Sequence, residues 1–410
     1  MSATGFSTFN KPLQRFLVAT VINMVGSAAL FGFVLIYFHE VRGISTGKSG
    51  LAVGAMSFTM VVLTPLAGSL SDRFGARRML AFGCVVSTIA GVSYVWVHSF
   101  VSAVAVSVLL GVGNALWFPA QSALMSLIVS PEERPTLMAW QRASMNLGAA
   151  LGGVVGGLLV HSESVSSYYL LFALNVATYL VFLAILPGMP SGRVTLPPKQ
   201  DRHGFREVFA DRFYVRLLVT DLAIALAFGF LWSFMPAYAS ALGIGKRTIG
   251  MLFMFGAATV VVTQIATLGW VRGGERMRWL AIMNLWFVGA FILMNITPHV
   301  GIWLAVALIA AGQVMGGFGE AILGAVRMPL TADLAPPTLM GRYYGLSTMV
   351  FQACMGLANT IGGATMGVSL SLVWVIPLVA SVLGVLGSLA LRRRIPQHAA
   401  VTAAIGVPVG

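Results

Sequence analysis

The sequence predicts an all-α integral membrane protein with twelve transmembrane helices in two pseudo-symmetric bundles of six. Three observations carry this prediction. Of the 410 residues, 58% are hydrophobic and 9% are charged, whereas a soluble domain is nearer half apolar and about a quarter charged. The apolar residues fall into about twelve continuous runs of the length that a helix needs to cross a bilayer, roughly 20 residues. Matching segments also recur about two hundred residues apart.

The apolar runs are expected to be helices, because backbone exposed to lipid must satisfy its own hydrogen bonds. Strands of a membrane barrel would be short and alternating, whereas these runs are long and continuous. The first six spans are expected at residues 16–38, 49–69, 79–97, 101–129, 136–160 and 168–186. The second six are expected at residues 214–239, 248–271, 279–296, 301–325, 343–366 and 370–391.

The repeat divides the chain into two halves. Arg15–Thr20 is echoed by Arg216–Asp221, and Pro135–Met138 is echoed by Pro337–Met340. We therefore expect an N-terminal half at residues 1–186 and a C-terminal half at 214–391. A cytoplasmic linker (187–213) joins them, and a cytoplasmic tail (392–410) follows. Parallel halves with a binding site at their interface are a transporter pattern.

The distribution of Lys and Arg predicts the orientation. With the N-terminus inside, the outer loops hold only Arg42, Lys48, Lys246 and Arg247 of the twenty-five basic residues. We therefore expect both termini to be cytoplasmic, in the plasma (inner) membrane. The first run is longer than a signal-peptide core, so we expect it to be retained.

Several other classes of protein are not supported by the sequence. The formal net charge of +13 is spread over loops rather than gathered on one face, so we expect no nucleic-acid partner. The six His show no metal-ligand spacing, and the segment Gly43–Ser49 is one residue short of a phosphate-binding loop. Cys84 and Cys354 lie inside apolar runs and imply no disulfide. We expect no enzyme activity, metal or cofactor, and a proton gradient as the energy source.

A short charged turn is expected between the second and third spans. It has the pattern Gly-x-Leu-x-Asp-Arg-x-Gly-x-Arg-Arg and contains Gly68, Asp72, Arg73, Gly75, Arg77 and Arg78. This pattern resembles the loop between helices 2 and 3 of the major facilitator superfamily, which implies the twelve-helix fold of that family. The resemblance also implies that this loop has a gating role, with Asp72 facing the start of helix 11 and the arginines pairing with Glu132 and Glu133. The corresponding segment 269–274 has no acid.

The fifth span carries Gly148, Gly152, Gly156 and Gly157. Glycines at four-residue steps let helix backbones approach closely in lipid. The string also resembles the helix 5 signature of the twelve-span drug:proton antiporters, although Gly153 stands where that family has Pro. These antiporters usually carry an Arg in helix 4, where this chain has Ser107, so the role of that Arg cannot be transferred.

Two acids lie inside predicted spans and are candidates for proton coupling: Glu320 and Asp221. An acid at a helix centre costs about 2.5–3.5 kcal/mol on insertion, so a function is expected in return. The alternative for Glu320 is a structural ion pair with Arg327 or with Arg142.

In the resembling family, helices 1, 4, 7 and 10 line a central cavity. The candidates for the substrate path are therefore the polar and aromatic residues on these spans: Asn23, Asn114, Trp117, Gln121, Phe228, Trp232 and Gln313. The alternative for each is a role in hydrogen bonding or packing between helices.

We therefore expect a monomeric secondary transporter that exports hydrophobic or amphiphilic small molecules, such as antibiotics, in exchange for protons by alternating access. One alternative is a proton-coupled importer of a sugar or an organic acid. A lipid-handling member of the same family and a membrane sensor that transports nothing are further alternatives.

Overall fold

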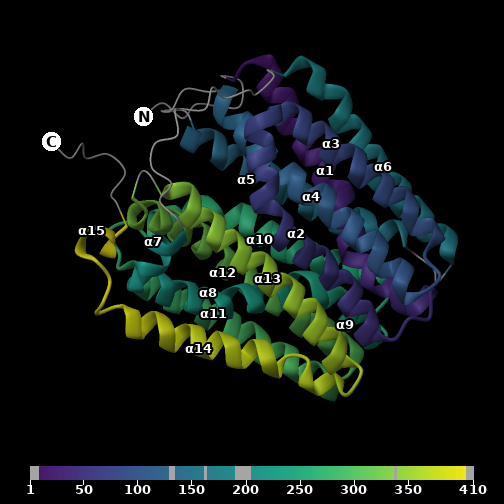
Figure 1. Cartoon of the computed structure of the whole chain (residues 1–410). Coiled ribbons are helices and arrows are strands. Elements are labelled where there is room, and N and C mark those ends of the chain that lie inside the picture. The colour runs from purple at the N-terminus through teal and green to yellow at the C-terminus, as the bar shows by residue number, and fades with distance from the viewer. Residues whose placement is uncertain (1–8, 129–133, 161–163, 190–204, 337–338, 403–410) are drawn as a thin grey trace.

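The computed structural model describes residues 9–128, 134–160, 164–189, 205–336 and 339–402. Every long element in these residues is a helix (Figure 1). The N-terminal half contains α1 (Lys11–Ile36) with a π-helical turn at Tyr37–Val41, α2 (Thr46–Phe74), α3 (Ala76–Ser93), α4 (Phe100–Ile128), α5 (Arg134–Leu159) and α6 (Val165–Ile185). This agrees with the predicted all-α architecture.

The C-terminal half follows a short helix, α7 (Phe205–Ala210). It contains α8 (Arg212–Gly229), a π-helical turn η5 (Phe230–Phe234), α9 (Met235–Ala241), α10 (Lys246–Trp270), α11 (Arg276–Ile296), α12 (Ile302–Leu334), α13 (Met340–Met366) and α14 (Val375–Leu391). The tail forms one further turn, α15 (Gln397–Ala400), and an isolated bridge between Glu275 and Val401.

Ten helical segments of the described chain are long and apolar enough to cross a membrane. The other two long helices, α5 and α13, have 26 and 27 residues but contain more glycine and polar side chains. The chain is therefore a multi-pass membrane protein, and α5 and α13 are the two predicted spans that hydropathy alone does not support.

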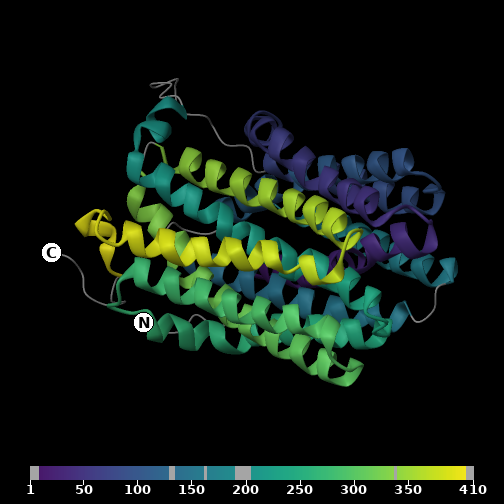
Figure 2. The same ribbon diagram turned by 90° about the horizontal axis from the view of Figure 1, so that it is seen from below.

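The two halves pack against each other through two pairs of helices. Inside the N-terminal half, α1 packs on α5 and α6, and α4 packs on α2 and α3; inside the C-terminal half, α8 packs on α13 and α14, and α11 on α12 and α14. Between the halves, α2 packs on α13 and α5 packs on α10. Figure 1 shows the two halves as two groups of helices, purple to blue and teal to yellow, and Figure 2, seen from below, shows the yellow helix α14 in front. One buried apolar core includes Phe33 and Met56 of the first half and Phe234 and Phe253 of the second.

The halves meet tightly at the end where α1 finishes. A Cβ atom at Gly50 would lie 2.2 Å from the carbonyl oxygen of Asn359, and one at Gly250 would lie 2.6 Å from that of Gly153. Near the opposite ends of α2 and α13, Gly68 and Gly345 have open space within 4 Å of the corresponding position. Because only glycine permits such close backbone approach, the glycines at the first end allow the halves to close there.

The predicted turn from Gly68 to Arg78 is wrong in extent. Helix α2 continues through Phe74, and only Gly75, with φ 92° and ψ 137°, interrupts the helices. Gly68, Asp72 and Arg73 are therefore helical, and α3 begins directly after Gly75. The reason is that a glycine with positive φ can reverse the chain within one residue.

The seventh span is also not the single regular helix that was predicted at residues 214–239. It widens into the π-helical turn Phe230–Phe234 immediately before Pro236. Proline has no N–H to donate to the carbonyl group four residues earlier, here that of Trp232, so the backbone must rearrange locally. Such π-helical turns often lie at functional sites, and this one carries Trp232.

Candidate transport site

A cavity of about 200 Å³ lies between the two halves. Five of the predicted substrate-path residues line it, from α1, α4, α8 and the π-helical turn η5: Asn23, Asn114, Trp117, Phe228 and Trp232. Since these residues come from both halves, a molecule in the cavity would contact both. The structure thus brings together side chains that lie far apart in the sequence.

Sequence reasoning missed other residues of the cavity wall. They include Met and aromatic side chains, with a few polar groups: Met24, Phe31, Met56, Met60, Asn175, Tyr179, Ser233, Phe253, Gln352 and Met355. Several lie on α2, α6, α10 and α13, outside the four helices expected to line the cavity. No single-residue signal separates them from ordinary membrane core. Only the packing of the helices on one another, including α1 on α6, α2 on α13 and α5 on α10, places them at the cavity.

Two predicted substrate-path residues lie elsewhere. Gln121 is buried and donates from Nε2 to the hydroxyl of Thr20 over 3.1 Å, which is a contact between α4 and α1. Gln313 lines a second, smaller pocket of about 10 Å³ together with Glu320. Gln121 thus lies in a helix-to-helix contact, as the alternative interpretation expected.

Trp232 connects the cavity to Glu320. Its indole Nε1 donates to Oε2 of Glu320 over 2.9 Å, and both Trp232 and Phe253 line the cavity and the small pocket. The indole stacks on Phe228 with ring centroids 5.7 Å apart and meets Phe253 edge-on at 4.9 Å. Glu320 itself is 6% exposed. The carboxylate therefore lies behind an aromatic wall rather than in the cavity.

Arg142 of α5 is the cation that faces Glu320 from the opposite half. Its guanidinium lies against Gly324, one helical turn from Glu320, where an added Cβ would be 3.1 Å from the guanidinium carbon. The Nε of Arg142 is buried and has no hydrogen-bond partner in the described part of the chain. The structure records no salt bridge between Arg142 and Glu320 among these residues.

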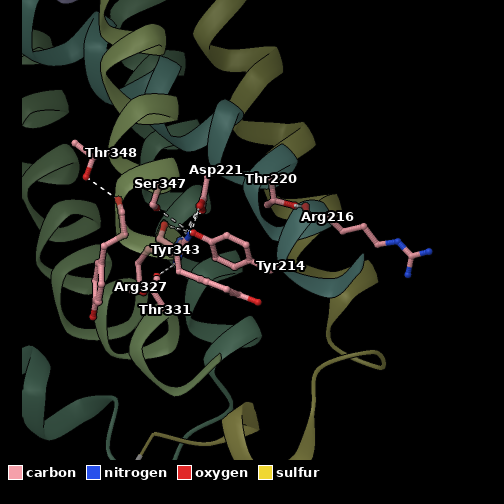
Figure 3. A network of polar contacts seen from close by, with 10 residues as sticks. Tyr214, Arg216, Thr220, Asp221, Arg327, Thr331, Tyr343, Ser347 and Thr348 are labelled. Carbon is pink, nitrogen blue, oxygen red and sulfur yellow. Dashed lines mark hydrogen bonds and ion pairs between the residues drawn. The ribbon is translucent and has the colours of Figure 1, made fainter. Parts of the chain in front are cut away.

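Arg327 pairs with Asp221 and not with Glu320, so the structure contradicts the alternative in which Glu320 and Arg327 form an ion pair. Its Nε lies 2.8 Å from both carboxylate oxygens of Asp221, and its Nη2 also donates to Ser347 over 3.2 Å. Its Nη1 donates to Thr331. Figure 3 shows Asp221 of α8, Arg327 and Thr331 of α12, and Ser347 of α13 pointing toward one another. Asp221 is thus held in a buried ion pair inside the C-terminal half.

A second set of contacts extends this network toward the start of α8. The hydroxyl of Tyr214 donates to the carbonyl oxygen of Tyr343 over 2.6 Å, and the hydroxyl of Tyr343 donates to Asp211 over 2.9 Å. Asp211 also caps α8 by accepting from the N–H of Tyr214 over 2.9 Å. These bonds fix α8 against α13.

The residues of the predicted gating segment make contacts within the N-terminal half. Arg77 donates to the carbonyl oxygens of Met189 and Pro187 over 2.6 and 3.4 Å, which ties α3 to the end of α6. The guanidinium of Arg73 lies 5.3 Å from the ring centroid of Phe74, and Arg78 is exposed. The side chain of Asp72, together with Glu132 and Glu133, lies outside the described residues.

The glycines of α5 lie at close helix contacts. A Cβ at Gly148 or Gly152 would be 2.5 or 2.6 Å from a carbonyl oxygen of α1, and one at Gly156 would be 2.9 Å from Phe33. Gly157 instead faces α10, where a Cβ would lie 2.8 Å from the Cα of Gly250. The α5 glycines therefore serve both the packing inside one half and the contact between the halves.

Two helical halves with a cavity between them are an architecture that secondary transporters use. The sequence profile of the Major Facilitator Superfamily matches residues 16–312. The chain belongs to this superfamily, which makes it a transporter and not an enzyme. Within the described residues, no group of three or more His, Cys, Asp or Glu side chains could hold a metal ion.

Curated relatives share about a quarter of their residues with the chain. It is 24% identical over 363 residues to the multidrug resistance protein MdtH of Aeromonas salmonicida (strain A449), which covers 86% of this chain and 87% of the relative. It is 25% identical over 343 residues to the uncharacterized MFS-type transporter YqjV of Bacillus subtilis (strain 168), with 80% of each chain covered.

Solved structures show the same fold at low sequence identity. A variant of the nucleoside transporter NupG has a TM-score of 0.75 at 11% identity, over 93% of this chain and 100% of that chain. A D-xylose-proton symporter has a TM-score of 0.72 at 18% identity, over 93% of this chain and 98% of that chain. At this level of identity the likeness establishes the fold alone.

Proposed function

We propose that the protein exports hydrophobic or amphiphilic small molecules in exchange for protons by alternating access. The observation that carries this proposal is the wall of the central cavity, which is built from aromatic and Met side chains with a few neutral polar groups. None of the described side chains that line it carries a formal charge. Flexible Met side chains let a binding surface adapt to different cargoes. The similarity to the multidrug resistance protein MdtH adds support.

The cavity of about 200 Å³ is smaller than the roughly 300–1,000 Å³ of a typical ligand pocket. The proposal therefore includes widening of the cavity as the halves rock apart at the end where Gly68 and Gly345 lie. The protein is proposed to lie in the plasma (inner) membrane with both termini in the cytoplasm. The end with Gly68 and Gly345 then faces the cytoplasm, and the tightly packed end faces outward. Cargo would then enter the cavity from the inside.

Glu320 is the group that we assign to proton coupling. It is buried and adjoins the cavity wall through Trp232. An acid inside a membrane span costs about 2.5–3.5 kcal/mol on insertion, and a function is expected to offset this cost. Asp221 is the weaker candidate, because taking up a proton would break its bonds to Arg327. The energy source is the proton gradient, and the proposal needs no cofactor. We expect a monomer to suffice.

The test is ethidium efflux from an efflux-deficient bacterial host, followed by ethidium flux in proteoliposomes with an imposed pH gradient. Wild-type protein should confer resistance and extrude the dye, and Glu320→Gln should abolish both at equal expression. Glu275→Gln, an exposed acid outside the spans, is the matched control and should retain activity. Flux that ignores both the pH gradient and Glu320→Gln would refute the proposal, and proton-driven uptake of a sugar or organic acid would favour the importer.

A further inference from the structure

We propose that Trp232 is the residue that couples cargo binding in the central cavity to the protonation of Glu320. This inference rests on the proposed function and assigns its coupling step to one side chain. Trp232 is a positioning residue here, because its indole lines the cavity and its N–H donates a hydrogen bond to Glu320. Cargo binding and protonation would then affect each other through Trp232, without direct contact between the cargo and Glu320.

The geometry gives Trp232 two neighbours that can change. On the cavity side, the indole stacks on Phe228 at 5.7 Å, so an aromatic cargo would meet both rings. On the other side, its Nε1 lies 2.9 Å from the carboxylate of Glu320. Trp232 and Phe253 are the residues shared by the cavity and the small pocket, as far as the described chain shows.

The backbone at Trp232 permits this side chain to move. Trp232 lies in the π-helical turn Phe230–Phe234, where Pro236 cannot donate to its carbonyl oxygen. The turn therefore lacks one of the backbone hydrogen bonds that hold a regular helix. The indole is also only partly buried, so rotation into the cavity meets less resistance than it would from the packed core.

The two protonation states of Glu320 hold the indole differently. An ionised carboxylate accepts a charge-assisted hydrogen bond, which is roughly twice as strong as a neutral one. The ionised acid therefore holds Trp232 against the wall and keeps the cavity open for cargo. When Glu320 takes up a proton, the bond weakens and the indole can turn into the cavity. Cargo and proton thus exclude each other, as exchange requires.

The charged groups nearest to Glu320 lie on α5 and α12. Arg142 of α5 lies one turn away, against Gly324. Arg327 lies two turns further along α12, and its guanidinium is paired with Asp221 of α8. The small pocket is otherwise lined by uncharged side chains of η5, α10 and α12, and α11 presents Phe287 and Met283 to neighbouring Gly319.

The experiment measures the affinity of the purified, lipid-embedded protein for ethidium between acidic and alkaline pH. For one exchanged proton, the wild-type Kd should rise by up to about tenfold for each unit of pH below the pKa of the coupling acid. Glu320→Gln should bind weakly at every pH. Trp232→Phe, which keeps a ring but loses the N–H, should change by less than about twofold across the range. Trp286→Phe, whose ring stacks on Phe318 away from the cavity, should behave as wild type.

Glu320→Asp provides a second variant if Trp232→Phe fails to fold. It keeps a titrating acid but withdraws the carboxylate from the indole, so it should also lose the pH dependence. Wild-type pH dependence in Trp232→Phe or Glu320→Asp, with none in Glu320→Gln, would overturn the role of Trp232 and leave the proposed function standing. Wild-type protein without pH dependence, or Glu320→Gln with it, would overturn coupling at Glu320 and this inference with it.

Discussion

Arg327 shows how partner choice is decided at the scale of single residues. On one helix, Glu320 and Arg327 are seven residues apart, which separates them by about 10 Å along the axis. Asp221 of helix α8 lies at the level of the guanidinium, and both of its carboxylate oxygens are 2.8 Å from Nε of Arg327. The pair is buried, with side chains 6% and 11% exposed. The ion pair therefore joins two helices and leaves Glu320 to Trp232.

Removing one member of this pair should destabilise the protein more than removing both. Asp221→Leu or Arg327→Met alone leaves an uncompensated buried charge and should cost about 3–5 kcal/mol of unfolding free energy. The double variant should recover most of that loss. Thermal unfolding in detergent measures the difference, and Thr348→Ala, at the edge of the network in Figure 3, is the control. A double variant less stable than either single one would contradict this account.

At the scale of elements, the ends of the helices decide how the halves and the tail meet. Helices α5 and α10 touch through Gly157 and Gly250, where the nearest backbone atoms would lie 2.6–2.9 Å from an added Cβ, and through Gly153, where an added Cβ would lie 2.5 Å from the ring of Phe253. At the opposite end of the C-terminal half, the tail returns to the α10–α11 connection. Thr402 exchanges two backbone hydrogen bonds with Gly273 and Gly274 over 3.1 Å each.

Gly250→Ala should prevent the tightly packed end from closing. Its new methyl group would lie 2.6 Å from the carbonyl oxygen of Gly153, and backbone atoms cannot give way as a flexible side chain can. We expect at least about a tenfold loss of transport. Labelling of Ser27→Cys, a cavity position, by an impermeant thiol reagent from outside should rise. Gly345→Ala, which has open space beside it, should transport normally, and equal loss in both variants would argue against a steric cause.

Docking of the tail should depend on pH through Glu275. Arg392 donates to its carboxylate and lowers the pKa of Glu275 below the usual range of glutamate. A lowered pKa means that the contact is complete above the ordinary glutamate pKa and is lost as the pH falls through the lowered value. The protection of residues 395–402 from hydrogen exchange, relative to the intrinsic exchange rate at each pH, should therefore stay high at neutral pH and fall only under more acidic conditions.

Two neighbouring arginines provide the test and the control for docking of the tail. Arg392→Gln should quicken exchange in the tail already at neutral pH, because the partner of Glu275 is gone. Arg393→Gln removes an exposed charge one residue away and should leave exchange unchanged. Tail exchange that is the same in both variants would mean that the backbone bonds alone hold the tail.

At the scale of the whole molecule, the structure is closed at one end by contacts between the halves. Glu40, in the π-helical turn after α1, pairs with Lys246 at the start of α10 over 2.5 Å. Ser240 of α9 donates to the same carboxylate. The side chains of Lys246 and Glu40 are 13% and 25% exposed, so water screens the pair only in part. These contacts must break whenever that end opens.

Glu40→Gln should make the closed end open more often. A partly exposed ion pair contributes about 1 kcal/mol, which is about a fivefold shift in the equilibrium between closed and open states. Outside labelling of Ser27→Cys should rise by about this factor, and exchanging the two charges (Glu40→Lys with Lys246→Glu) should restore it. Lys48→Gln, which removes an exposed cation at the same end, should have no effect. Labelling that the charge exchange does not restore would assign the effect to Ser240 instead.

The sequence by itself determined the class of protein, because the ability of a segment to cross a membrane depends on its local composition. Long apolar runs, the asymmetry of Lys and Arg, the repeated halves and the charged motif around Asp72 are all properties of neighbouring residues. They were enough to predict the all-α membrane architecture and the superfamily. The low hydropathy of α5 and α13 also has a local cause, the glycines and polar side chains that these helices use where the two halves meet.

Only the tertiary structure decided which side chains face one another. The ten apolar spans of the described chain carry few charged residues, so periodicity does not distinguish a cavity wall from a helix contact or a lipid face. The sequence could therefore place Trp232, Gln121 and Arg327 on helices but could not choose their partners. Those partners, Glu320, Thr20 and Asp221, are set by the height and rotation of adjacent helices, which depend on packing across the whole bundle.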